Sequence, residues 1–496
     1  MKILIANRGE IAIRIMRACR DLGFSSVAVY STGDREALHT RYADQAVYIG
    51  PTPAFQSYLN QDAILSAARK SGADAIHPGY GFLSENAGFA RRVEKVGLVF
   101  IGPSPQSIAL TGDKLAARRI ARDAGVPVLP GCEFKLSNKE VFKTIGEQIG
   151  YPVLVKAVSG GGGRGIRLAH NEDELNNVVS SASQEAKLAF GDEQVYIEKF
   201  IHPARHIEVQ VLGDGNGNVI VIGERECSIQ RRHQKIIEEA PAPGLDSVSR
   251  ERLYEAARKV ALALNYRSLG TIEFLMDSHH DFYFIEVNPR IQVEHPITEM
   301  VTGIDLANAQ LLLAASGCLT LRQEQVSLRG AAIEARIIAE DPEQSFMPTS
   351  GQITYLKEPG GSGVRVDSAL YEGMWVTTDY DSLIAKVIVW GEDRATAIRR
   401  MIGALDDFKI VGVTTDLDYL KTILRSEAFL SAEADTMYLE SFQPQEPENL
   451  EALQRETALA ATLFIHNTLK QKARQTSEFV GQWRAIAWRE QMAGNF

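Results

Sequence analysis

The sequence predicts a protein of α/β and α+β domains, with a doubly wound parallel sheet at its N-terminus. Apolar segments of strand length alternate with amphipathic segments of helix length over the first hundred residues. From residue 208 onward, several strand-like segments follow one another, which is typical of an antiparallel sheet. The chain has 496 residues, more than a single hydrophobic core accommodates, so about two to four packed units are expected.

The N-terminal region has the pattern of a parallel sheet. The sequence predicts strands at 2–6, 26–30, 73–77 and 98–101 and a helix at 11–22. Connections of this kind produce parallel strands with helices on the faces of the sheet. The first turn between strand and helix, Asn7 to Glu10, lacks the G-x-G-x-x-G pattern, so a dinucleotide site is not predicted.

Breaks in composition divide the rest of the chain. A Gly-Pro-Ser-Pro break at 102–105 precedes a helix expected at about 114–124. Residues 150–198 have the order strand, glycine loop, strand, helix, strand, which is compact enough for a small subdomain. Further strands are predicted at 209–212, 219–223, 271–276, 282–287, 331–338, 351–356 and 383–390, with helices at 394–406 and 448–474. The predicted domains are 1–112, 113–328 with a lid at about 131–203, 329–442, and a linker with a helical extension at 443–496.

Composition and charge exclude several classes of protein. Hydrophobic residues make up 45% and charged residues 23% of the chain, as in ordinary globular enzymes. The net charge of -10 disfavours nucleic acid as a partner. No apolar run is long enough for a signal peptide or a membrane span, so a cytoplasmic location without a membrane partner is expected. The widely spaced cysteines indicate neither a zinc site nor a disulfide framework: Cys19, Cys132, Cys227 and Cys318.

A glycine-rich loop at 159–165 follows a predicted strand that contains Lys156. Because glycines lack Cβ atoms, such a loop can bring several backbone N–H groups against phosphate oxygens. It is not a Walker A loop, since G-x-x-x-x-G-K-[ST] is absent from the chain. A mobile hairpin turn is the alternative interpretation. The positions of Lys156 and of Lys114 favour a site for the phosphates of ATP.

Two glutamates are expected to face each other across a β-hairpin. A hairpin centred between His279 and His280 puts Glu273 opposite Glu286. Two carboxylates on one face destabilise a sheet unless a cation neutralises them. The pair therefore predicts a site for one or two Mg²⁺ ions on ATP phosphates. The alternative is a different register, in which one glutamate faces water.

Polar side chains alternate along the chain after this hairpin. They are Glu286, Asn288, Arg290, Gln292 and Glu294, with apolar residues or proline between them. Residues at this spacing share one face of an extended chain. A solvated strand edge is one explanation. We favour a catalytic face that supplies a metal ligand, an anion-binding guanidinium and a base.

Five stretches together resemble the biotin carboxylases of the ATP-grasp superfamily. They are residues 5–12, 77–86, 159–165, 226–235 and 286–296. They occur in the family's order over roughly the first 440 residues and are jointly very specific. The resemblance implies an ATP-grasp fold in which a mobile lid and a larger sheet hold ATP with Mg²⁺ or Mn²⁺, and it implies bicarbonate as the co-substrate.

The resemblance also implies roles for particular residues. Those expected to bind the nucleotide are Lys114, Lys156, Gly161, Gly162, Gly163, Glu198, Lys199, Ile201, His206, Gln230, His233, Glu273 and Glu286. The expected metal ligands are Glu273, Glu286 and Asn288. The expected bicarbonate and biotin pockets contain Lys235, Arg290, Gln292, Val293, Glu294 and Arg336. Of these, Lys235, Arg290, Glu294 and Arg336 are expected to be catalytic.

The chemistry implied by the family explains these residue types. Bicarbonate is a poor electrophile, so ATP first phosphorylates it, and Arg290, Lys235 and Mg²⁺ supply a positive field for the anions. Glu294 is expected to take the bicarbonate proton as general base. The resulting carboxyphosphate breaks down to CO₂ and phosphate, after which Arg336 is expected to stabilise the biotin enolate.

The expected partners follow from what the chain lacks. No Ala-Met-Lys-Met or similar biotinylation sequence occurs, so biotin is expected on a separate carrier protein, with the carboxyltransferase on another polypeptide. The resemblance further implies a homodimer. The expected carboxyl acceptor is acetyl-CoA or another acyl-CoA, with pyruvate or another 2-oxoacid as the alternative. The extension after Gln443 either docks onto a partner or covers this chain's own surface.

Two other functions are weighed against this one. A non-catalytic nucleotide-binding scaffold would be expected to have lost Glu273, Glu286, Arg290 or Glu294, and all four are present. Another ATP-grasp ligase would activate a different carboxylate. The stretch at 226–235, together with residues 290–294, favours bicarbonate and biotin instead.

Overall fold

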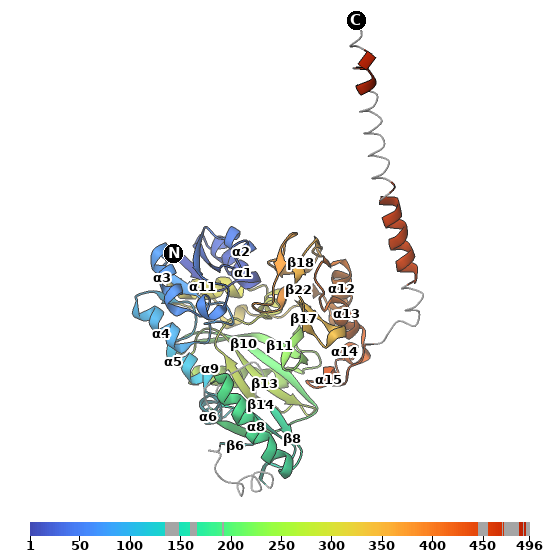
Figure 1. Cartoon of the computed structure of the whole chain (residues 1–496). Coiled ribbons are helices and arrows are strands. Elements are labelled where there is room, and N and C mark those ends of the chain that lie inside the picture. The colour runs from blue at the N-terminus through green and yellow to red at the C-terminus, as the bar shows by residue number, and fades with distance from the viewer. Residues whose placement is uncertain are drawn as a thin grey trace. The chain divides into compact units, whose positions relative to one another are not determined.

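The computed structural model describes residues 1–133, 148–158, 166–190, 193–444, 455–468, 470, 486–489 and 491–492. The chain divides into two compact units, Met1–Phe442 and Gln443–Phe496. Figure 1 shows the elements of the first unit, with its parallel sheet near the N-terminus and its antiparallel strands beneath. The predicted phosphate loop, with Gly161, Gly162 and Gly163, lies outside the described residues.

The N-terminal sheet is parallel, as predicted. Its five strands have the order β3-β2-β1-β4-β5 and are β1 (Lys2–Ile5), β2 (Ser25–Ser31), β3 (Gln45–Gly50), β4 (Ala75–His77) and β5 (Val99–Phe100). The helices of this region are α1 (Gly9–Asp21), α2 (Leu38–Tyr42), α3 (Gln61–Ser71), α4 (Ala87–Lys95) and α5 (Pro105–Gly112). The sequence analysis missed β3, although residues 46–49 are all apolar; it is an edge strand of which only Ile49 is buried.

An eight-stranded antiparallel sheet forms the centre of the unit. Its order is β14-β13-β10-β11-β12-β15-β22-β20. The strands are β10 (Ala204–Asp214), β11 (Val219–Arg231), β12 (Gln234–Ala240), β13 (Arg267–Asp277), β14 (Phe282–Asn288), β15 (Ala331–Ile338), β20 (Val364–Ser368) and β22 (Leu383–Gly391). Because β12 pairs with β15, this sheet runs continuously across residue 328, where the sequence predicts a domain boundary.

A smaller sheet forms the lid. Its order is β6-β9-β7-β8, with β6 (Gly131–Glu133), β7 (Val153–Ala157), β8 (Arg167–Ala169) and β9 (Val195–Lys199). Helix α8 (Glu172–Phe190) packs Leu175, Val179 and Ala182 against the apolar side of these strands. The lid therefore has a hydrophobic core of its own, separate from that of the eight-stranded sheet.

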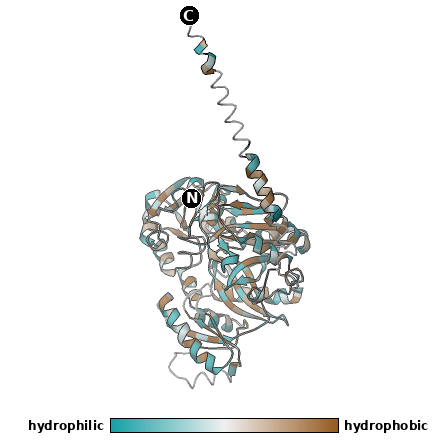
Figure 2. Cartoon of the chain, turned by 45° about the vertical axis from the view of Figure 1, so that its right-hand side comes forward, coloured by the Kyte–Doolittle hydropathy of each residue, from teal (hydrophilic) through white to brown (hydrophobic). Residues whose placement is uncertain are grey.

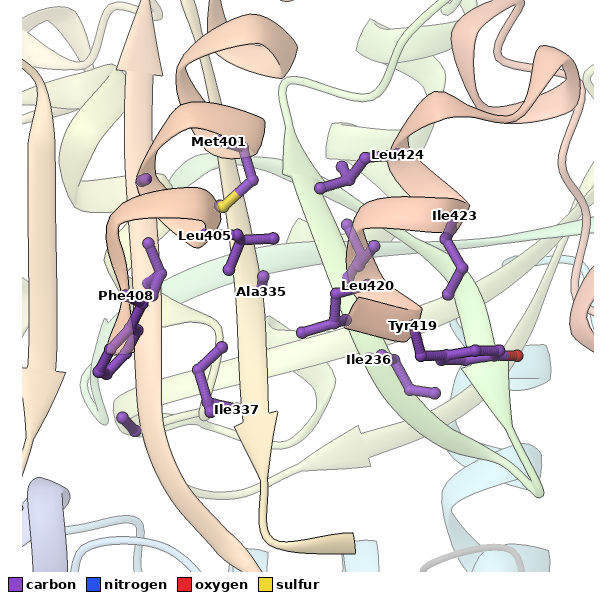
Figure 3. Packing of buried hydrophobic residues seen from close by; sticks show 14 of the residues in the cluster. Ile236, Ala335, Ile337, Met401, Leu405, Phe408, Tyr419, Leu420, Ile423 and Leu424 are labelled. Atoms are coloured by element: carbon purple, nitrogen blue, oxygen red, sulfur yellow. The ribbon is translucent and has the colours of Figure 1, made fainter. Parts of the chain in front are cut away.

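Helices cover the C-terminal half of the large sheet. Figure 3 shows side chains of α12 (Arg394–Asp407) and α13 (Leu417–Arg425) packed on β12 and β15. Met401, Leu405 and Leu420 meet Ile236 and Ile337 there, all of them buried. Burial of each such side chain contributes about 1.5–3 kcal/mol. This packing fixes β15 against its neighbours.

One predicted strand in this region is wrong. Residues 351–356 form two short strands, β18 (Gly351–Gln352) and β19 (Tyr355–Lys357). The first pairs with β21 (Trp375–Val376) and the second with β23 (Lys409–Val411). The sequence contains no turn signal between the two strands. The chain nevertheless changes its pairing partner from β21 to β23 at Ile353, whose side chain is buried in the core.

The remaining elements connect these layers. They are α6 (Lys114–Asp123), α9 (Ser247–Ala263), α10 (His295–Thr302), α11 (Leu306–Ser316), α14 (Glu427–Leu430), α15 (Tyr438–Ser441), β16 (Glu340–Asp341) and β17 (Met347–Pro348). Figure 2 shows hydrophilic and hydrophobic residues intermixed along the ribbon of the first unit. Among the helices that the structure describes, none combines the length and the apolar composition needed to cross a membrane.

The second unit contains a helix at residues 455–468, which agrees with the described part of the helix predicted at 448–474. Leu459, Leu463, Phe464 and Ile465 are exposed on it.

Candidate active site

The predicted hairpin pair is confirmed. Strands β13 and β14 align Glu273 with Glu286. Nearer the turn the register differs by one residue from the prediction, since Phe274 pairs with Phe284. A β-bulge at Ile285 restores the predicted alignment. The two carboxylates share a face of the sheet because of that bulge.

Lys235, on β12, lies at the centre of the site. Its ammonium group contacts Glu208, and its Nζ lies 2.8 Å from Glu273 Oε1 and 2.7 Å from Glu294 Oε1. Burial alone would lower the pKa of Lys235, but the three carboxylates raise it well above its usual value. Lys235 is therefore a fixed cation among anions that come from three different segments.

Glu294 is fully buried between two cations. Its Oε1 accepts a hydrogen bond from Lys235 Nζ at 2.7 Å, and its Oε2 accepts one from Arg336 Nη2 at 3.0 Å. Burial alone would raise the pKa of Glu294, but Lys235, Arg336 and Arg225 hold it well below its usual range. Glu294 is thus ionised, which is the form that a general base needs.

The extended face expected from Glu286 to Glu294 is wrong after Asn288. Strand β14 ends at Asn288, and α10 begins at His295. Pro289 has no N–H group for the ladder, so the chain leaves the sheet there.

The polar residues of this loop nevertheless remain connected. Arg290 Nη1 donates to Gln292 Oε1 at 2.8 Å, and Arg290 Nη2 donates to Asn288 Oδ1 at 3.0 Å. Arg290 also pairs with Glu85, which belongs to the 77–86 motif. The carbonyl of Val293 accepts a hydrogen bond from the buried Lys386 at 2.7 Å. Arg290 and Gln292, two residues of the predicted bicarbonate pocket, are thus in direct contact.

The expected nucleotide residues fall into two groups. In the lid, Lys156 contacts Glu198, and Lys199 Nζ donates to the carbonyls of Gly150 (3.1 Å) and Tyr151 (3.0 Å). In this structure these lysines therefore bind protein oxygens. Ile201 follows the end of β9.

The second group lies beside the glutamate pair. Lys114 Nζ is 3.7 Å from Glu286 Oε2, and His206 Nε2 is 3.1 Å from Glu273 Oε2. Gln230 faces Lys235 across the β11–β12 ladder. The pKa of His233 is lowered by desolvation and by the nearby positive charges of Lys156, His206 and Lys114. Because Lys156 of the lid contributes to the lowered pKa of His233, the two groups of residues lie in one region.

Oxygen atoms suited to a divalent cation are present. Glu273 and Glu286 supply carboxylates, and Asn288, whose amide lies 2.8 Å from Glu273 Oε1, supplies a carbonyl. Mg²⁺ prefers such hard oxygen ligands, so this donor set fits the ion. His206, Glu208 and Glu273 also place ligand atoms within 4.8 Å of one another. Both sets contain Glu273. We favour the first set, because Glu208, which only the second set contains, already contacts the cations of Arg225 and Lys235.

Three charged residues of the site were missed by the sequence analysis. Glu208, Arg225 and Glu238 are all fully buried on the large sheet. Arg225 contacts Glu208 and donates to Gln210 Oε1 at 2.8 Å. One signal was available: Glu208 stands two residues after His206, so the two share a face of β10.

Comparisons with known proteins show which family the chain resembles. Residues 1–108 match the model "Biotin carboxylase, N-terminal domain", residues 113–322 match "Carbamoyl-phosphate synthase L chain, ATP binding domain", and residues 334–441 match "Biotin carboxylase C-terminal domain". The biotin carboxylase of Pseudomonas aeruginosa is 50% identical over 440 residues, which is 88% of this chain and 98% of that protein.

Other relatives differ in their stated function. A pyruvate carboxylase subunit from Methanothermobacter thermautotrophicus is 51% identical over 442 residues, or 89% of this chain and 90% of that protein. Among solved structures, biotin carboxylase from Campylobacter jejuni in complex with a β,γ-ATP ligand has a TM-score of 0.86 and 48% identity. That match covers 89% of this chain and 98% of that chain.

The parallel sheet, the lid sheet and the large antiparallel sheet define an ATP-grasp ligase. Within that class, the chain belongs to the biotin carboxylase family. It is an enzyme, an ATP-dependent carboxylase that forms a C–N bond, which confirms the prediction from the sequence motifs.

Proposed function

We propose that this enzyme transfers a carboxyl group from bicarbonate to biotin on a separate carrier protein, through carboxyphosphate, as the first half-reaction of an acyl-CoA carboxylase. The observation that carries the proposal is the buried carboxylate of Glu294, which bridges Lys235 and Arg336. Lys235 stands beside the glutamates of the predicted metal site, and Arg336 lies on the neighbouring strand. Glu294 thus lies between Lys235, on the side of the site proposed for bicarbonate, and Arg336, on the side proposed for biotin.

On the bicarbonate side, Arg290 and Lys235 hold the anion, and Glu294 takes its hydroxyl proton. The freed oxygen attacks the γ-phosphorus of ATP, and ADP leaves. Two cations within one buried site lower the repulsion between the two anions. Bound Mg²⁺ would supply further positive charge on the phosphates at Glu273, Glu286 and Asn288.

On the biotin side, carboxyphosphate breaks down to CO₂ and phosphate. The phosphate removes the proton from the ureido nitrogen, and that nitrogen forms the new C–N bond with CO₂. Arg336 is proposed to stabilise the negative charge on the ureido oxygen, since its guanidinium is buried and permanently charged. Burial alone would lower the pKa of Arg336, but Glu238, Glu294 and Glu334 raise it.

The remaining nucleotide roles are also proposals. We assign Lys114, Lys156, His206, Gln230 and His233 to ATP. The ammonium groups of Lys156 and Lys114 contribute to lowering the pKa of His233, so two cations lie near this residue, which supports a polyanionic ligand there. Glu198, Lys199, Ile201 and the glycines at 161–163 are proposed to complete the nucleotide site from the lid. Gln292, whose buried Nε2 has no hydrogen-bond partner within the described part of the chain, is proposed to donate to bicarbonate, next to the carbonyl of Val293.

The domain division stays a proposal. The matched segments at 1–108, 113–322 and 334–441 support the division at 1–112, 113–328 and 329–442, with a lid at about 131–203 and an extension at 443–496. Because β12 pairs with β15, the second and third proposed domains would share the large sheet. The cytoplasmic location stays a prediction.

The proposed partners are a second copy of this chain, a biotin carrier protein and a carboxyltransferase. One solved relative, the biotin carboxylase domain of Hydrogenobacter thermophilus 2-oxoglutarate carboxylase, is described as a dimer with MgADP and bicarbonate, which supports the homodimer and these ligands. Acetyl-CoA or another acyl-CoA is the proposed acceptor. Pyruvate is the second candidate, favoured by the 51% identity to the pyruvate carboxylase of Methanothermobacter thermautotrophicus.

The enzyme is expected to hydrolyse ATP only when bicarbonate is present, and to do so faster when biotin is added in solution. The measurement is ADP release with each component left out in turn, with Arg290→Gln as a variant. Loss of the Arg290 guanidinium should lower the bicarbonate-dependent rate by about 100-fold, as for other charge-stabilising donors. ATP hydrolysis that is indifferent to both bicarbonate and biotin would contradict the proposal.

The acceptor can be tested separately. The chain is mixed with a biotinylated carrier and with a carboxyltransferase for acetyl-CoA, propionyl-CoA or pyruvate. Transfer of labelled bicarbonate to an acyl-CoA is the expected result. Transfer to pyruvate alone would replace the first candidate by the second.

A further inference from the structure

Glu238 contacts the arginine on the biotin side of the site. It lies on β12, three residues after Lys235, and it is fully buried. Its Oε1 accepts a hydrogen bond from Arg336 Nε at 2.6 Å and also contacts Arg336 Nη2. Its Oε2 has no hydrogen-bond partner in the part of the chain that the structure describes. Arg336 is therefore the partner that balances this buried charge.

The sheet fixes this contact. Strands β12 and β15 align Glu238 with Glu334, so Arg336, two residues further along β15, is the diagonal neighbour of Glu238 on the same face. Neighbouring strands of a packed sheet do not shift relative to each other without breaking their ladder. The contact is consequently part of the rigid framework.

Arg336 is shared between two carboxylates. Glu238 binds the Nε side of the guanidinium, while Glu294 Oε2 lies 3.0 Å from Nη2. In the proposed reaction Glu294 takes the bicarbonate proton and becomes neutral. At that moment Arg336 loses one of its two anionic partners, before charge develops on biotin.

We propose that Glu238 is a positioning residue, which holds the guanidinium of Arg336 in place for the biotin enolate after Glu294 has been neutralised. This inference rests on the proposed function. A guanidinium held at one edge keeps its other N–H groups directed at a developing oxyanion, and displacement of such a group by about 1 Å is enough to lower a rate by about 100-fold.

The electrostatics of Glu238 agree with this role. Burial raises the pKa of Glu238 to about 7, although Arg336 opposes the rise. Arg336 is the cation that most favours the ionised form of this carboxyl group, and Lys235 contributes less. Moving the guanidinium of Arg336 away would therefore raise the free energy of ionising Glu238.

The test compares Glu238→Gln with Glu239→Gln in the full-length protein. Glu239 is the adjacent residue, is also buried, and pairs with Arg394 at 2.7 Å instead. Two rates are measured for each protein: bicarbonate-dependent ATP cleavage without biotin, and carboxylation of biotin, with its KM and kcat. For Glu238→Gln, the biotin rate is expected to fall at least about tenfold more than ATP cleavage. Glu239→Gln is expected to show no such split.

The outcomes separate the possibilities. Equal losses of both rates in Glu238→Gln, or the same split in Glu239→Gln, would overturn the positioning role. If Glu238→Gln does not fold, Glu238→Asp retains the charge but shortens the side chain by one methylene group, and the same selective loss is then expected of it. A wild-type protein that carboxylates no biotin would overturn the proposed function itself, whatever the variants do.

Discussion

Replacing Glu294 by glutamine is expected to lower biotin carboxylation by about 10²–10⁴-fold, the range that general base catalysis contributes. The amide cannot take the bicarbonate proton. The substitution also removes the negative charge between Lys235 and Arg336. These two cations then lie close together without the carboxylate that they share. Both effects act on the same step, and ATP cleavage should fall together with carboxylation.

The measurement is the bicarbonate-dependent rate of ADP release and of biotin carboxylation in both proteins. Glu224→Gln is a matched control, because Glu224 is buried like Glu294 but pairs with Arg250 and contacts Tyr254. Circular dichroism checks that each variant is folded. A Glu294→Gln protein with more than about a tenth of wild-type activity would contradict the role of general base.

Replacing Arg225 by methionine is expected to give the largest loss of stability, about 3–5 kcal/mol, the cost of breaking a buried ion pair from one side. Arg225 is fully buried. It contacts Glu208 and donates hydrogen bonds to Thr298 Oγ1 (2.9 Å) and Thr271 Oγ1 (3.0 Å). Without Arg225, Lys235 is the counter-charge that remains for Glu208 among the residues that the structure describes.

The urea midpoint of unfolding measures this loss. Lys187→Met is the control, since Lys187 forms an exposed ion pair with Glu193, and exposed pairs contribute little. The prediction fails if Arg225→Met moves the midpoint no further than Lys187→Met does. ATP or bicarbonate added during the titration should not restore the midpoint fully, because the missing cation lies within the protein core.

Local patterns predicted much of the fold and part of the site. The alternation of strand-like and helix-like segments predicted the parallel sheet. The equal distances of Glu273 and Glu286 from the turn predicted that they lie opposite each other. The pair was found although the turn differs by one residue from the prediction, because the bulge at Ile285 compensates for it. A bulge depends on contacts between strands, which hydrophobic spacing does not contain.

The buried charges could not be predicted in this way. Glu208 and Glu238 follow apolar residues, and Arg225 stands between Glu224 and Glu226. Charged residues in such a sequence usually indicate an exposed face. These three residues are buried because partners from other strands neutralise them. Those partners are up to about a hundred residues away in the sequence. The sequence analysis expected metal ions to neutralise the glutamates, whereas Glu273 in this structure also contacts His206 and Lys235.

The pairing of β12 with β15 limits how this protein can be divided. A fragment that ends near residue 328 would leave the backbone groups on one side of β12 without their partners on β15 and create a new sheet edge, which is a site for aggregation. The same cut would separate Arg336 from Glu238 and Glu294. Truncations and fusions that aim to preserve the enzyme should therefore be made after Phe442, at the boundary between the two compact units, and the matched segments should not be exchanged singly between relatives.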